Sequence, residues 1–102
     1  MSLTKHRKTQ LVIVAEALLE KILVREARER GAQGWTVTEV HGGAVEGVRE
    51  GRWEADRTVE IRLICEPEVA DAIAEHVLKT HAPHYSVSVH FAEVWVLRPE
   101  RF

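Results

Sequence analysis

The sequence predicts one α+β domain, spanning residues 1–102, in which two helices cover one face of a four-stranded sheet. Four segments show the continuous or alternating apolar pattern of strands, and two show the three-to-four-residue apolar spacing of helices. Glycine and proline separate most of these segments. A chain of 102 residues, 45% apolar and with a net charge of -2, fits an ordinary globular domain.

The first half of the chain predicts a strand, a helix and a second strand. Residues 9–15 form a short apolar run that is typical of a strand buried on both faces. From Glu16 to Arg30, apolar residues recur at helical spacing among charged ones, and Gly31 follows where a helix commonly ends. Residues 34–40 are rich in β-branched and aromatic side chains, which favour a strand.

The second half predicts the same three elements in the order strand, helix, strand. Residues 57–65 alternate between apolar and charged side chains, as a strand with one wet face does. Pro67 is suited to the first turn of a helix, and an apolar stripe runs from Val69 to Leu78. Residues 86–97 are the last predicted strand.

This order predicts a ferredoxin-like βαββαβ sandwich with both helices on one face of the sheet. Residues 11–14 and 94–97 are apolar at successive positions, so the face without helices is also expected to be apolar. Exposed apolar sheet usually marks an interface. We therefore expect a homo-oligomer whose sheets face one another, with ligand sites in the clefts between subunits.

The cysteine content and the N-terminus indicate a soluble, cytoplasmic protein. Cys65 is the only cysteine and cannot form an internal disulfide, and it is expected to be a small buried apolar residue. Glu16 interrupts the apolar run that follows the basic N-terminus, unlike the core of a signal peptide. No segment approaches the roughly 20 apolar residues of a membrane-spanning helix.

The connection between the second and third predicted strands, residues 41–53, is long and contains four glycines. Glycine allows backbone conformations that aim several N–H groups at one anion. Four arginines could add guanidinium groups that bind phosphate or bicarbonate oxygens in pairs. They are Arg49, Arg52, Arg98 and Arg101. A solvated loop with incidental arginines explains the same residues, and Trp53 is either an interface anchor or packing at the base of the loop.

Two stretches of sequence carry a resemblance to a known family. "GAQGWTVTEVHGG" at residues 31–43 and "TVEIRLICEPEVADAIAEHV" at residues 58–77 resemble the PII signalling superfamily, and the similarity extends from residue 11 to residue 97. The resemblance implies that residues 41–53 belong to the mobile T-loop of that family. It also implies a homotrimer that binds adenine nucleotides, ADP or ATP, between its subunits.

The details favour the PII-like branch of SbtB-type and CPII-type proteins. The glycine- and lysine-rich phosphate-binding turn of the nitrogen regulators is replaced here by "THAPHYSV", and the T-loop lacks their glutamine that helps bind 2-oxoglutarate. "LVIVAEALLEKI", "GGAVEGVREG" and "AEVWVL" resemble the bicarbonate-associated proteins instead. This branch implies bicarbonate as a second ligand and regulation of inorganic carbon uptake, through a bicarbonate transporter, or of carboxysome function.

The resemblance also assigns residues to the nucleotide site. They are Thr36, Gly42, Gly43, Arg49, Ile64 and Arg98, and Arg101 joins them as one of the arginines that could bind phosphate. Arg98 corresponds to an arginine that reaches the phosphates from a neighbouring subunit. Arg49 corresponds to a T-loop arginine that holds phosphates, and Arg49 or Arg52 is assigned to bicarbonate, because the register within the loop leaves their roles exchangeable.

Other functions are less well supported by the residues. A trimeric metal sensor of the same fold could use His81, His84 or His90, but these histidines lack a third ligand at a fixed spacing. A purely structural trimer is a third possibility. The sequence shows no grouping of serine, histidine and aspartate that would predict an enzyme. The slightly acidic net charge argues against nucleic-acid binding. Trp35 and Trp95 lie at core-like spacing among strand residues, so they are predicted to pack in the core or at trimer contacts rather than to stack on bases.

Overall fold

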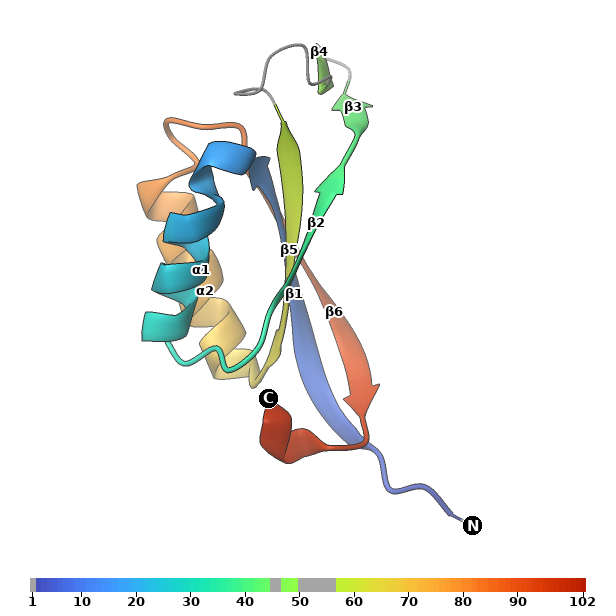
Figure 1. The fold of residues 1–102 in the computed structure, drawn as a ribbon. Helices are drawn as coiled ribbons and strands as arrows, with labels where there is room; N and C mark the ends of the chain where they lie inside the picture. Colours follow the sequence, from blue (N-terminus) through green and yellow to red (C-terminus); the bar gives the residue numbers. More distant parts are fainter. Residues whose placement is uncertain (1, 45–46, 50–56) are drawn as a thin grey trace.

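The structure is a computed structural model that describes residues 2–44, 47–49 and 57–102. Four antiparallel strands form the main sheet in the order β2-β5-β1-β6, with both helices packed on one face (Figure 1). The strands are β1 His6–Glu16, β2 Thr36–Val40, β5 Thr58–Cys65 and β6 Ser88–Val96, and the helices are α1 Glu20–Glu29 and α2 Pro67–Thr80. The predicted ferredoxin-like fold is confirmed. None of the helices in the described part of the chain is long and apolar enough to cross a membrane.

The first helix begins later than the sequence predicts. Strand β1 continues to Glu16, a 3-10 turn follows over Ala17–Leu19, and only then does α1 begin. Glu16 is still paired with Thr58 of β5, and the Ala17 amide donates a hydrogen bond to the Arg57 carbonyl at 2.7 Å. These backbone bonds hold the chain in the sheet beyond the apolar run, which is why helical spacing alone placed the boundary too early.

The core lies between the helices and the two central strands. Register places Leu11 opposite Leu63 and Ile13 opposite Ile61, so that all four side chains face the helices and are fully buried. The main contributors from the helices are Leu23, Ala27, Ile73 and Val77. Burying each large aliphatic side chain stabilises the fold by roughly 1.5–3 kcal/mol.

The open face of the sheet is less apolar than predicted. Val12, Val14 and Val94 do lie on it, but Arg62 and His90 share this face with them. The face is therefore a mixed surface with an apolar stripe along β1 and β6.

Neither described tryptophan lies in the core. The first of the two predicted roles, packing in the core, is therefore wrong for both, and the second, a trimer contact, stays a prediction. Trp35 is 41% exposed and Trp95 is 62% exposed. Phe91 pairs with Leu11, which faces the helices. Trp95, four residues further along β6, lies on the same face as Phe91 and therefore on the helix side of the sheet. Leu97 follows the last residue of β6 and is also exposed.

Cys65 is buried, as predicted. Its side chain is 1% exposed at the end of β5. Burial, together with the nearby Glu66 carboxylate, raises the pKa of the Cys65 thiol to about 11. The thiol is therefore protonated at neutral pH, and a thiolate nucleophile is disfavoured at this position.

The long connection after β2 contains regular structure. Its strands β3 Gly42–Ala44 and β4 Gly47–Arg49 pair in antiparallel fashion to form a two-stranded ribbon. The ribbon continues from the end of β2 beyond the main sheet (Figure 1). Within the described residues, the segment predicted as an open loop is thus partly a β-ribbon.

Helix α1 ends at a glycine that the backbone requires. Gly31 has φ of +114°, a conformation that side chains with a Cβ rarely adopt. A Cβ atom at this position would also lie 3.3 Å from Cγ2 of Val69 on α2. This turn brings residues 32–35 back toward the start of β2.

Replacing this glycine should therefore cost stability. We expect Gly31→Ala to lower the free energy of unfolding by about 1–3 kcal/mol, because the new side chain would be held in a strained backbone conformation. Urea unfolding followed by circular dichroism measures the change. Gly34→Ala is the matched control, since nothing lies within 4 Å of a Cβ there. Equal losses in the two variants would show that the backbone conformation of Gly31 is unimportant.

Candidate functional site

A hollow of about 410 Å³ lies on the open side of the sheet, where β2 begins. Four separate parts of the chain form it: β1, the segment leading into β2, β5 and the C-terminus. The lining residues are Gln10, Gln33, Gly34, Trp35, Thr36, Arg62, Ile64, Arg101 and Phe102. We call this hollow the sheet pocket.

Strand register explains why the sheet residues of the pocket converge. Thr36 of β2 pairs with Arg62 of β5, and Gln10 of β1 pairs with Ile64 of β5. Arg62 and Ile64 are two residues apart on β5, so their side chains emerge on the same face. The open face therefore presents these four side chains as neighbours.

The C-terminal turn supplies one wall of the sheet pocket. The 3-10 turn Pro99–Arg101 is closed by hydrogen bonds from the Arg101 amide to the Arg98 carbonyl and from the Phe102 amide to the Pro99 carbonyl, each 3.1 Å long. This turn folds back toward the end of the sheet where β2 begins (Figure 1). It thereby brings a guanidinium group and an aromatic ring to the pocket.

The charge of the sheet pocket is positive. Arg62 is partly neutralised, since its Nε lies 2.7 Å from Oε2 of Glu60. Arg101 forms no ion pair with any residue that the structure describes. A guanidinium group without an acidic partner can bind carboxylate or phosphate oxygens in a bidentate manner. The pocket therefore favours an anionic ligand.

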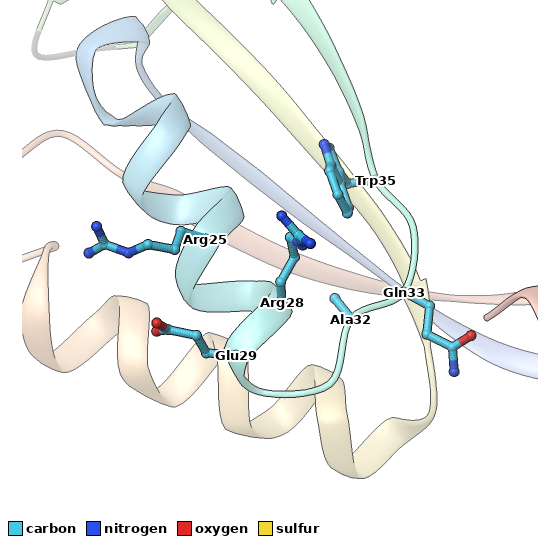
Figure 2. Close-up of a pocket in the computed structure, with 6 residues that line it drawn as sticks. All are labelled: Arg25, Arg28, Glu29, Ala32, Gln33 and Trp35. Carbon is cyan, nitrogen blue, oxygen red and sulfur yellow. The ribbon is translucent and has the colours of Figure 1, made fainter.

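A second hollow, of about 560 Å³, lies between the end of α1 and the start of β2 (Figure 2). Its lining residues are Arg25, Arg28, Glu29, Ala32, Gln33 and Trp35. Trp35 and Gln33 line both hollows. We call this second hollow the helix pocket.

The structure brings three of the predicted nucleotide-site residues into the sheet pocket. They are Thr36, Ile64 and Arg101. Arg98 does not line it. Its side chain is 68% exposed, and its Nε lies 3.6 Å from Oε2 of Glu100. The assignment of Arg98 to a neighbouring subunit stays a prediction.

The remaining predicted residues belong to the T-loop region. Gly42 pairs with Arg49 and Gly43 with Val48 across the β-ribbon, at the opposite end of β2 from Thr36. Their roles in ligand binding stay predictions. Arg52, assigned to bicarbonate, and Trp53 lie outside the described residues.

Sequence reasoning missed several lining residues of the sheet pocket. They are Gln10, Gln33, Gly34, Trp35, Arg62 and Phe102. The alternation of residues 57–65 could have pointed to Arg62, because it places Arg62 on the same face as Ile64. No sequence pattern indicates that Phe102 folds back to the start of β2.

The histidines do not form the metal site that the alternative hypothesis requires. His84 and His90 are exposed, and in the described part of the chain neither belongs to a group of three potential ligands. His81 is buried beside Glu26 and His76, with potential ligand atoms of the three residues within 4.8 Å of one another. The sequence missed this cluster because Glu26 and His81 are 55 residues apart and meet only through helix packing.

The contacts of this cluster favour a hydrogen-bonded network over metal binding. Nε2 of His81 lies 2.7 Å from Oε1 of Glu26, and Nε2 of His76 lies 3.1 Å from the same oxygen, although without good hydrogen-bond alignment. Arg30 places a guanidinium nitrogen 2.9 Å from Nδ1 of His76. Because Arg30 can only donate, Nδ1 must accept, and the proton then sits on Nε2, the atom that a metal would need.

The network also changes the acidity of Glu26. Burial raises the pKa of the Glu26 carboxyl, but the hydrogen bond from His81 and the contact with His76 outweigh it, so the pKa falls below its usual value of 4.5. The ionised carboxylate is therefore the form that the fold stabilises, and it joins α1 to α2.

The sheet order, with both helices on one face and the sheet pocket on the other, defines a protein of the ferredoxin-like fold class. The family model for nitrogen regulatory protein P-II matches residues 8–101, and the chain belongs to this family.

Solved structures agree with this assignment. The chain is 34% identical to a protein from Thermus thermophilus described as a candidate PII-like signalling protein, with a TM-score of 0.85 and coverage of 98% of this chain and 99% of the other. It has a TM-score of 0.88 and 20% identity to CPII from Thiomonas intermedia bound to ADP, AMP and bicarbonate, covering 99% and 98% of the two chains. A search of the curated proteins found no match.

The depressed pKa of Glu26 predicts how its contribution to stability depends on pH. Because the folded-state pKa lies below the unfolded value, the carboxylate stabilises the fold fully above about pH 4.5 and loses this effect as pH falls further. We expect Glu26→Gln to lower the free energy of unfolding by about 1–3 kcal/mol at pH 7, and the deficit to shrink below about pH 4.

Urea titrations at several pH values measure this difference. Glu29→Gln on the same helix is the matched control. Glu29 is 61% exposed, and its nearest ion-pair contact, with Arg30, is a weak one at 4.0 Å. A deficit for Glu26→Gln that is independent of pH would contradict the assigned role of the carboxylate.

Proposed function

We propose that this chain is a non-enzymatic PII-like signalling protein that binds ADP or ATP, with bicarbonate as a modulating ligand. The observation that carries the proposal is the sheet pocket, where Thr36, Ile64 and Arg101 meet from separate parts of the chain. The resemblance assigns Thr36 and Ile64 to the nucleotide site, and Arg101 is one of the arginines predicted to bind phosphate. Membership of the P-II family supports a regulatory rather than a catalytic role.

The size and chemistry of the sheet pocket suit an adenine nucleotide. A volume of about 410 Å³ lies within the usual range of roughly 300–1,000 Å³ for small-molecule sites. Arg62 and Arg101 offer charge to phosphates, while Ile64 and Phe102 offer apolar surface to a base. CPII, which shares the fold, is bound to ADP, AMP and bicarbonate in one solved structure and to ADP and bicarbonate in another.

The proposed active unit is a homotrimer. Val14 and Val94, which are half-buried on the open face beside the buried Val12, would be covered by association of the sheets. Arg98 is exposed beside the C-terminal turn and would reach the nucleotide of a neighbouring subunit. In such a trimer, each sheet pocket is completed by a second copy of the chain.

Strand β2 provides the route from ligand to partner. It begins at Thr36 in the pocket and leads within five residues toward the ribbon of β3 and β4. A ligand that contacts both ends of β2 would favour one arrangement of the T-loop by its difference in affinity. Gly42, Gly43 and Arg49 would contact its phosphates, and Arg49 or Arg52 would bind bicarbonate. The proposed partner that recognises this arrangement of the T-loop is a bicarbonate transporter or a carboxysome-related protein.

Calorimetric titration with ADP tests the proposal. Wild-type protein should bind ADP with an affinity that increases when bicarbonate is present. Arg101→Ala should weaken ADP binding about ten- to a hundredfold, because it removes a charge-assisted hydrogen bond worth roughly 1.5–3 kcal/mol. Arg25→Ala is the matched control, since Arg25 lines the helix pocket and not the sheet pocket. Absence of heat with ADP and ATP would refute the proposed nucleotide binding.

Light scattering on the same samples tests the assembly. We expect the mass of three chains for wild-type protein and for Arg101→Ala, because Arg101 is assigned to the ligand and not to the trimer contact. A single-chain mass in the presence of ADP would contradict the proposed completion of the site by a second subunit.

A further inference from the structure

Trp35 occupies an unusual position between the two hollows. It lines both the helix pocket and the sheet pocket, and its side chain is 41% exposed rather than packed in the core. It immediately precedes Thr36, whose side chain faces the open side of the sheet. A large aromatic ring at the wall of a ligand pocket can bind the flat face of another ring.

Arg28 constrains the ring from the side of the helix pocket. The carbon of its guanidinium group lies 5.2 Å from the centre of the Trp35 ring, within the range of a cation–π contact. Figure 2 shows Arg28 extending from α1 toward Trp35. Arg28 forms no ion pair with the described residues, so the indole is its main described partner. The contact limits the orientations that the indole can adopt.

The sheet pocket offers further groups suited to a base. Phe102 supplies a second aromatic side chain, and Gln10 and Gln33 supply amide groups that can both donate and accept hydrogen bonds. The arginines Arg62 and Arg101 line the same pocket. Aromatic, amide and guanidinium groups thus meet in one hollow, which matches a ligand that has a flat heteroaromatic ring and an anionic group.

From this arrangement we propose that Trp35 is the stacking platform for the base of the bound nucleotide, with Arg28 as a positioning residue that holds the indole from behind. The inference rests on the proposed function and identifies how the base is bound. Stacking of a base on an aromatic side chain tolerates every base, so Trp35 would contribute affinity for nucleotides over phosphates. Discrimination among bases would fall to Gln10 and Gln33.

The chain contains a matched internal control. Trp95 is also exposed and also has an arginine over its ring, with the guanidinium carbon of Arg7 at 5.9 Å from the ring centre. This second pair lies on β1 and β6 and lines neither of the two hollows. Loss of an exposed tryptophan in general can therefore be separated from loss of the proposed platform.

Calorimetry with ADP as the probe tests the platform. We expect Trp35→Leu to weaken ADP binding about tenfold, Trp35→Phe to weaken it less, and Trp95→Leu to leave it unchanged. Arg28→Gln should weaken ADP binding severalfold, whereas Arg28→Lys, which keeps a cation near the ring, should restore most of the affinity. Circular dichroism and light scattering verify fold and assembly of each variant.

Fluorescence provides a measurement that keeps residue 35 unchanged. In a protein with Trp53→Phe and Trp95→Phe, Trp35 is the only remaining tryptophan. ADP should quench its emission, and inorganic pyrophosphate, which has no base, should not. This experiment stays informative even where Trp35→Leu does not fold.

The outcomes separate the two proposals. If wild-type protein binds neither ADP nor ATP, the proposed function fails and the platform fails with it. If wild-type protein binds ADP while Trp35→Leu binds it equally well and the Trp35 emission is unchanged, the proposed function stands and the platform is wrong. Equal weakening by Trp35→Leu and Trp95→Leu would likewise overturn the assignment to Trp35.

Discussion

The register of β5 is the constraint on which both the core and the candidate site depend. Ile61 pairs with Ile13 on one side and Val37 on the other, while the next residue, Arg62, pairs with Thr36. Because successive side chains alternate, Ile61 enters the core and Arg62 faces the sheet pocket. A slip of one residue would exchange the two faces of the strand, bury a guanidinium group and dismantle the pocket. Selection for a stable core therefore also preserves the geometry of the site.

The helix side of the sheet supports the site through two features of α1. The turn at Gly31 allows the chain to leave the helix and return to the sheet, which sets the approach of Trp35 to β2. The network of Glu26 with His81 and His76 holds the same helix against α2. A helix secured in this way can hold Arg28 in a constant position over the indole. The hydrogen-bonded network thus contributes to the pocket indirectly, by keeping its supporting helix in place.

The two hollows carry positive charge that an anionic ligand could neutralise. Glu60 balances Arg62, but Arg101 and Arg28 form no ion pairs with the described residues. Exposed arginines without acidic partners cost little in water, yet they favour an anion once apolar surface excludes solvent. In the proposed trimer, the neighbouring subunit would supply that exclusion and add Arg98. Nucleotide binding, assembly and the arrangement of β2 would then depend on one another.

The sequence by itself determined the order of elements, the end of α1 at Gly31 and the burial of Cys65, because periodicity and backbone preference are local properties. Family resemblance further pointed to Thr36 and Ile64, and the phosphate-binding chemistry of arginine pointed to Arg101. Only the tertiary structure decided that these residues share a pocket with Phe102, that Glu26 meets His76 of α2 and His81 just after it, and that Trp35 is exposed between two hollows. Such contacts join segments far apart in the chain, and they arise from strand register and helix packing, which no local pattern specifies.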